Sequence, residues 1–227
     1  MRIFLVRNVP AAGWSSPTPL NLRPRVLTLV YLCFGLFLFG FGEALLITSG
    51  AGVSPWTVLA QGVARHLGVS IGTATFAVSI LVLLAWIPLR QRPGIGTILN
   101  AIVIAATIEL VLPYLPVATD FTLQAIEVIT GILLVGLGSG IYLIANLGAG
   151  PRDGLMTGLQ RVTRLPIAWV RVGIEVTVVA IGWMLGGVVG FGTVVFALGI
   201  GPAVSAGLYL TAWVNGIEVR DASRAQQ

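Results

Sequence analysis

The chain alternates between long runs without charged residues and short segments that carry arginine. The charge-free runs are Val26–Gly42, Leu67–Leu89, Pro93–Ile108, Val128–Pro151 and Val176–Ile217. One membrane crossing takes about 20 apolar residues, so the last run is long enough for two and the glycines at 186–192 divide it. The pattern therefore predicts six spanning helices, at about residues 26–48, 69–89, 95–114, 123–146, 167–186 and 192–214.

Two segments between the spans, Pro55–His66 and Pro151–Arg164, are too short to cross a bilayer. In the first, Thr57, Gln61 and Arg65 recur every fourth residue and form a polar stripe beside apolar positions. The second segment has the same character. Both are predicted to be short amphipathic helices that lie at the membrane interface or re-enter the protein.

The composition excludes a soluble protein. Only 9% of the residues are charged and 56% are hydrophobic, whereas soluble domains carry about 25% charged residues. The net charge of +5 does not indicate nucleic-acid binding, because the basic residues, all of them arginine, lie in short clusters between the apolar runs. The single cysteine, Cys33, allows no intramolecular disulfide.

Arginine placement predicts the orientation, since cytoplasmic loops are enriched in basic residues. With six crossings and a cytoplasmic N-terminus, eleven of the thirteen arginines are cytoplasmic and only Arg65 is clearly outside. We therefore expect a multi-pass protein of the bacterial cytoplasmic (inner) membrane with both termini cytoplasmic. The expected units are an N-terminal tail (1–25), two three-helix units (26–114 and 115–214) and a C-terminal tail (215–227).

The two three-helix units repeat one another. Gly50-Ala51-Gly52 recurs as Gly148-Ala149-Gly150 at an offset of 98, each followed by a proline that opens a short helix. Gly94–Thr97 recurs as Gly190–Thr193 at an offset of 96. Three crossings per unit is an odd number, so the second unit must run inverted relative to the first. The expected fold class is an all-α integral membrane protein with six transmembrane helices as a 3+3 inverted repeat, a plan that recurs in secondary transporters.

The run from Gly148 to Met156 (GAGPRDGLM) and the earlier run from Gly50 to Trp56 (GAGVSPW) resemble the bacterial YczE/YyaS/YitT-like integral membrane proteins. The resemblance covers about residues 25–214. It implies a multi-pass inner-membrane protein and supports the architecture more than any substrate.

The candidate site in the second unit consists of Gly148, Gly150, Arg152 and Asp153. Pro151 suits the first helical position, Asp153 would interact favourably with the helix dipole, and free N–H groups beside glycine can meet an anion. Arg152 can add a bidentate contact to a carboxylate or phosphate. The alternative is structural, with Asp153 capping the helix and Arg152 anchored at headgroups.

The candidates in the first unit are Glu43, Gly50, Gly52 and Ser54. Glu43 lies about five residues from the end of its span, where a carboxylate is a candidate proton relay, cation site or substrate contact. It could instead reach the outer interface or cap a neighbouring helix. Ser54 is the predicted N-cap of the short helix, a role that needs no ligand.

No catalytic, metal-binding or cofactor-binding motif accompanies these residues. The sequence holds one histidine and one cysteine, and neither a HExxH nor a GxSxG run. We expect no enzymatic activity, no cofactor and no metal. Two hypotheses remain: a secondary transporter or permease for a small polar or anionic solute, and a non-transporting membrane scaffold or regulatory partner. Besides the lipid bilayer and a small-molecule solute, the expected partners are a second copy or another membrane protein. Residues Pro10–Pro24 are expected to be disordered or to lie on headgroups.

Overall fold

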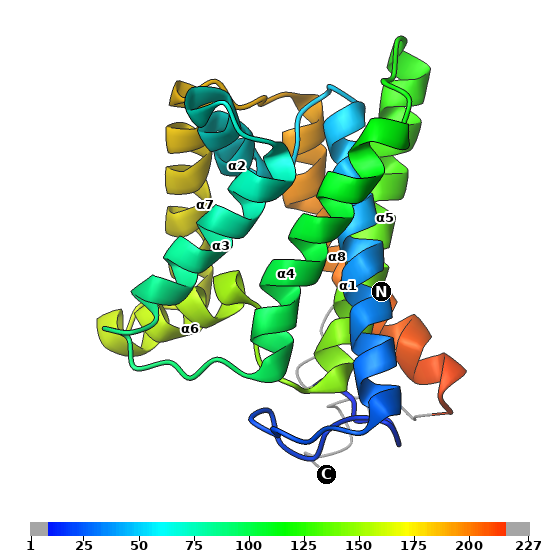
Figure 1. Ribbon diagram of the computed structural model, residues 1–227, viewed down its shortest axis with the longest axis vertical. Coiled ribbons are helices and arrows are strands. Elements are labelled where there is room, and N and C mark those ends of the chain that lie inside the picture. The colour runs from blue at the N-terminus through cyan, green and yellow to red at the C-terminus, as the bar shows by residue number, and fades with distance from the viewer. Residues whose placement is uncertain (1–8, 217–227) are drawn as a thin grey trace.

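The computed structural model describes residues 9–216, which form eight α-helices and one 3₁₀ turn with no strand (Figure 1). The helices are α1 (Val26–Thr48), α2 (Pro55–Leu67), α3 (Ile71–Ala85), α4 (Ile95–Val111), α5 (Phe121–Ala145), α6 (Pro151–Thr163), α7 (Ile167–Met184) and α8 (Phe191–Val214). The 3₁₀ turn Leu112–Tyr114 extends α4. The outer parts of the two predicted tails, residues 1–8 and 217–227, lie outside the described residues.

Five helices are long and apolar enough to cross a membrane: α1, α4 with its 3₁₀ turn, α5, α7 and α8. Their bounds match the predicted spans to within a few residues. The predicted span at 69–89 is shorter in the structure. Its helix, α3, reaches spanning length only together with α2, from which it is bent by 113°. The all-helical, multi-pass architecture is therefore confirmed, with five spans or six if this bent pair counts as one.

Close helix contacts at small residues build the core. Helix α1 packs along α5, where Gly35 lies against Gly138 and Gly42 against Gly131. Helix α8 covers the other side of α5, and a Cβ on Gly136 would lie 2.5 Å from Ala203. In a bilayer, where lipid tails are as apolar as leucine, such small residues let backbones approach and gain dispersion energy.

Helix α4 packs against α1 and joins this core to a second group, formed by α2, α3, α6 and α7. Helix α2 packs against α7, and α6 contacts both α3 and α7, while α3 leans on α4 (Figure 1). Along the chain the six long helices alternate in direction: α1, α4 and α7 run one way and α3, α5 and α8 the other. The short helices α2 and α6 lie toward opposite ends of the molecule.

Hydrogen bonds connect the glycine–threonine turns at 94–97 and 190–193 to the two glycine loops. Each turn binds the loop that belongs to the other three-helix unit. The N–H of Gly96 donates to the Leu147 carbonyl at 2.8 Å, and the Thr97 hydroxyl donates to the Ala149 carbonyl at 2.7 Å. Correspondingly, the Gly192 N–H donates to the Ala51 carbonyl at 2.8 Å. Each loop is thus fixed by a backbone turn about 50 or 140 residues away in the sequence.

The glycine loops correspond at an offset of 96, and not at the offset of 98 that the matching letters indicate. The positive-φ positions of the first loop are Gly50 (φ 64°) and Gly52 (φ 108°), whereas those of the second are Asn146 (φ 52°) and Gly148 (φ 113°). The structural counterpart of Gly52 is therefore Gly148. Asparagine tolerates the left-handed region well enough to stand where the first loop has Gly50.

Residues 12–16 of the segment before α1 are packed against the protein, so the expectation of a disordered segment is wrong for this part. Residues 17–20, 22 and 23 are exposed, and their expected position on headgroups stays a prediction. The Trp14 side chain is only 5% exposed and its indole N–H donates to Asn215 at 2.9 Å. The Ser15 hydroxyl donates to the Ile144 carbonyl, and the Asn146 amide donates to the Ser16 carbonyl. The end of α5 offers free carbonyls at this point, and the segment supplies their donors.

Candidate functional site

Glu43 is a fully buried carboxylate in α1, with 0% of its surface exposed. Its Oε2 accepts hydrogen bonds from the hydroxyls of Ser54 at 2.9 Å and Thr57 at 2.7 Å. Its Oε1 is buried without a partner among the described residues. The alternative that Glu43 reaches the outer interface is therefore wrong, because its side chain turns inward to the first turn of α2.

The glycine loop after α1 directs α2 back toward Glu43. Gly50 and Gly52 reverse the chain with positive φ, after which Ser54 is extended and Pro55 opens α2. Proline fits there because its missing N–H would have no helical acceptor. Ser54 occupies the N-cap position but makes no side-chain cap hydrogen bond. Its hydroxyl binds Glu43 instead, so a conventional side-chain cap is the wrong description of its role.

Helix α6 begins in an equivalent way and carries two charged residues in its first turn, Arg152, which is partly exposed, and Asp153, which is exposed. Gly150 is its N-cap residue, Pro151 its first residue, and Arg152 and Asp153 follow in the first turn. Asp153 does not cap the helix. Its Oδ2 accepts a hydrogen bond from the hydroxyl of Tyr142, a buried residue of α5, at 2.8 Å.

A tryptophan fixes the start of α6 to α3. The indole N–H of Trp86 donates to the Pro151 carbonyl at 2.9 Å. Gly154 lies against the same ring so closely that a Cβ at this position would overlap it. The glycine of the Pro-Arg-Asp-Gly run thus serves helix–aromatic packing.

Arg152 joins the first turns of the two short helices. Its guanidinium carbon lies 5.4 Å from the centre of the Trp56 ring in α2, within cation–π range. Burial lowers the pKa of the Arg152 guanidinium from its ordinary value, while the negative charges of Glu43 and Asp153 act in the opposite direction. Among residues 9–216 the guanidinium forms no ion pair, and the one ion pair there joins Arg171 and Glu175.

The structure brings most of the predicted candidates together. Ser54 contacts Glu43 directly, and the charge of Arg152 acts on both Glu43 and Asp153. Gly52, Gly148 and Gly150 shape the loops behind these side chains, whereas Gly50 is exposed and only turns the chain. We call Glu43, Ser54, Thr57, Trp56, Arg152, Asp153 and Tyr142 the central polar cluster.

Sequence reasoning missed three members of the central polar cluster: Trp56, Thr57 and Tyr142. Trp56 and Thr57 belong to the first turn of α2, where the sequence indicated only a short amphipathic helix with Thr57 in its polar stripe. Tyr142 could not be predicted, because the surrounding apolar residues of its span do not indicate that its hydroxyl contacts an acid. The proline that precedes Trp56 and Thr57 was the one available sign that they lie beside Ser54.

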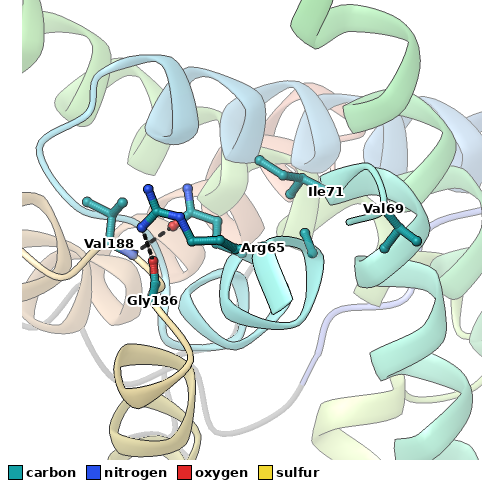
Figure 2. A pocket seen from close by; sticks show the side chains of 7 residues that line it. Arg65, Val69, Ile71, Gly186 and Val188 are labelled. Carbon is teal, nitrogen blue, oxygen red and sulfur yellow. Dashed lines mark hydrogen bonds between the residues drawn. The ribbon is translucent and has the colours of Figure 1, made fainter. Parts of the chain in front are cut away.

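A separate pocket of about 290 Å³ lies at the far end of α2 and does not contain Glu43. Figure 2 shows Arg65 reaching across it to the loop after α7, where its guanidinium donates to the Gly186 carbonyl at 3.0 Å. The Val188 N–H donates to the Gln61 side chain at 3.0 Å on the same side. These polar groups hold the end of α2 to the end of α7.

No metal site is evident among residues 9–216, since no three His, Cys, Asp or Glu side chains lie together there. The central polar cluster contains two acids, Glu43 and Asp153, and its other charged residue is Arg152, which is not a metal ligand.

Comparison with known proteins identifies the family of the chain and several relatives. Residues 26–207 match the model of a family of unknown function, DUF6198. The chain belongs to this family. It is 42% identical to an "Uncharacterized protein" of Haemophilus influenzae over 199 residues, covering 88% of this chain and 90% of the relative. It is 34% identical over 175 residues to the "Uncharacterized membrane protein YczE" of Bacillus subtilis, covering 76% and 81%.

A more distant relative is the "Uncharacterized protein YyaS" of the same Bacillus, 24% identical over 168 residues, covering 72% and 84%. No solved structure matches the chain. The resemblance to YczE-like proteins is thereby confirmed, and with it the assignment as a multi-pass membrane protein.

Proposed function

We propose that this protein is a secondary transporter or permease for a small polar or anionic solute. The observation that carries the proposal is the central polar cluster. In it, the buried carboxylate of Glu43 binds the start of α2, and Arg152 lies in the first turn of α6. Ionisable groups at this depth are costly and are typical of substrate or ion pathways. Helix N-termini that point at a site between helices are likewise a feature of transporter folds.

An inverted 3+3 repeat is the architecture that we propose for the transporter. It is supported by the alternating helix directions in Figure 1 and by the equivalent contacts of the two glycine loops at an offset of 96. It is also supported at the ends of the short helices. Arg65 of α2 binds the Gly186 carbonyl after α7, and Arg161 of α6 binds the Leu89 carbonyl after α3.

We propose that the chain crosses the bacterial inner membrane six times and has both termini in the cytoplasm. The distribution of arginine supports this topology. We propose no enzymatic activity. Without a nucleotide-binding loop, transport would use a solute or ion gradient or a partner subunit.

The proposal is tested by solute uptake into liposomes that contain the purified protein. Small anions, amino acids and vitamins are offered together, and the trapped solutes are identified by mass spectrometry against protein-free liposomes. We expect uptake of at least one solute and its loss in Glu43→Gln and in Arg152→Gln. Glu109→Gln and Arg92→Gln, which change exposed residues of the same types, should retain it.

A non-transporting scaffold or regulatory partner is the second candidate. The close glycine contacts between α1, α5 and α8 favour it, because they describe a tightly packed bundle. If no solute enters faster than in protein-free liposomes, this candidate replaces the transporter, and crosslinking in cells would then identify the partner.

A further inference from the structure

Two groups of opposite charge in the central polar cluster have unused hydrogen-bonding capacity. Oε1 of Glu43 is fully buried and has no partner among the described residues. The Arg152 guanidinium faces the Trp56 ring and forms no ion pair there. Buried polar groups are nearly always hydrogen-bonded in native proteins, so Oε1 of Glu43 points to a missing ligand. Arg152 is partly exposed, and its donors are available to the same ligand.

The charges of the central polar cluster favour a ligand without net charge. Glu43 and Asp153 are acids, and Arg152 is a cation. The N-termini of α2 and α6 each contribute about half a positive charge. With both acids ionised these charges nearly cancel. A solute with net charge would leave an uncompensated charge in a medium of low dielectric constant, whereas a dipolar solute would not.

Exposure indicates how such a solute would be oriented. Asp153 is exposed, Arg152 is partly exposed and Glu43 is completely buried. The cluster is therefore open on the side of α6 and closed at Glu43. Arg152 is held over Trp56 and can bind a carboxylate with two parallel hydrogen bonds. With Glu43 ionised, Oε1 can only accept, so it requires an N–H or O–H group.

We propose that the solute is a small zwitterion, with its carboxylate on Arg152 and its ammonium group on Oε1 of Glu43. The inference rests on the proposed transport function and narrows the substrate class from polar or anionic solutes to amino-acid-like molecules. Ser54 and Thr57 assist by occupying Oε2, which leaves Oε1 as the free acceptor.

The test is thermal unfolding of the purified full chain in the presence of compounds that carry a carboxylate, an ammonium group, or both. The zwitterions are glycine, alanine, β-alanine and γ-aminobutyrate. Acetate and propionate carry only the carboxylate, and methylamine and ethylamine only the ammonium. A ligand at free concentration c that binds only the folded state stabilises it by RT ln(1 + c/Kd) and so raises the melting temperature as its concentration exceeds Kd. We expect at least one zwitterion to raise it and the one-ended compounds to have no effect.

Glu43→Gln should weaken binding of that zwitterion roughly ten- to hundredfold, the usual cost of losing a charge-assisted hydrogen bond. Arg152→Gln should do the same, while Glu109→Gln and Arg92→Gln, which change exposed residues, should bind like the unmodified protein. If Glu43→Gln does not give a folded, monodisperse protein, Glu43→Asp replaces it, because it keeps the charge but withdraws the carboxylate by one methylene.

Two results would overturn the inference. If acetate or propionate stabilises the protein as well as the zwitterions do, the solute is an anion. If none of the three groups of compounds stabilises it, the solute is not a small zwitterion. The uptake experiment decides separately about transport: uptake of any solute that depends on Glu43 and Arg152 keeps the proposed function even when the zwitterion is wrong.

Discussion

The contact between Gly52 and the turn that opens α8 can be tested by adding a single methyl group. Gly52 has φ 108°, and a Cβ there would lie 2.5 Å from the Gly190 nitrogen and 2.7 Å from the Thr193 hydroxyl. Gly50, two residues earlier, has φ 64°, and a Cβ there would meet nothing within 4 Å. Comparing alanine at the two positions therefore separates the cost of an unfavourable backbone conformation from the cost of steric crowding.

The expected losses of stability differ accordingly. Gly50→Ala should cost about 1 kcal/mol, the lower end of the penalty for a side chain in the left-handed region. Gly52→Ala adds contacts with backbone atoms that cannot rotate away, and overpacking of this kind typically costs about 1–3 kcal/mol more. Its φ also lies outside the left-handed well that alanine can occupy, which costs about 1–3 kcal/mol by itself. We expect a total loss of about 3 kcal/mol or more.

The assay is the free energy of unfolding of both variants in detergent micelles. Gly173→Ala in α7 is the matched control, because a Cβ there meets nothing within 4 Å and the residue is helical. Alanine is about 1 kcal/mol more favourable than glycine in a helix, so this variant should be as stable as the unmodified protein or more so. Equal losses for Gly50→Ala and Gly52→Ala would refute the contact between the loop and the turn.

Three further outcomes are expected. In a cysteine-free background, Gly50→Cys and Ala149→Cys should react with an impermeant maleimide from opposite sides of the membrane, and reaction from one side would contradict the inverted repeat. Tyr142→Phe removes the donor to Asp153 and should lower the free energy of unfolding by about 1 kcal/mol, since Asp153 is exposed and water can replace the hydroxyl. An unchanged thermal unfolding curve would mean that this hydrogen bond contributes nothing. Trp14→Ala should cost about 3 kcal/mol in the same assay because the ring is buried, and a negligible loss would show that the segment before α1 does not pack as described.

The helices could be predicted from the sequence because their signals are local. The absence of charge over about 20 residues marks a span, and Pro55 and Pro151 mark the starts of α2 and α6. The length of α3 was overestimated for the same reason. Apolar residues continue past Ala85, but the chain there leaves the helix through turns that apolarity does not reveal.

The central polar cluster could be predicted only in part, because it depends on how helices are rotated and bent. The sequence places Glu43 inside a span but does not say whether it faces lipid or protein. It became part of the cluster because Gly50 and Gly52 turn the chain so that the start of α2 reaches Glu43. The pairing of Tyr142 with Asp153 depends on a second reversal of this kind, and no spacing in the sequence encodes it.

The offset of 96 shows that the first turns of α2 and α6 carry different side chains, which bears on the proposed solute. At this offset Trp56 corresponds to Arg152 and Thr57 to Asp153, so the two first turns share a backbone but not a chemistry. The counterpart of Glu43 is Ser139, whose hydroxyl donates to the carbonyl of its own helix. One first turn thus presents a ring and hydroxyls beside a buried carboxylate, and the other presents a cation and an acid. A solute with identical ends would be poorly matched to both, whereas a molecule with one anionic and one donor end has a distinct partner at each.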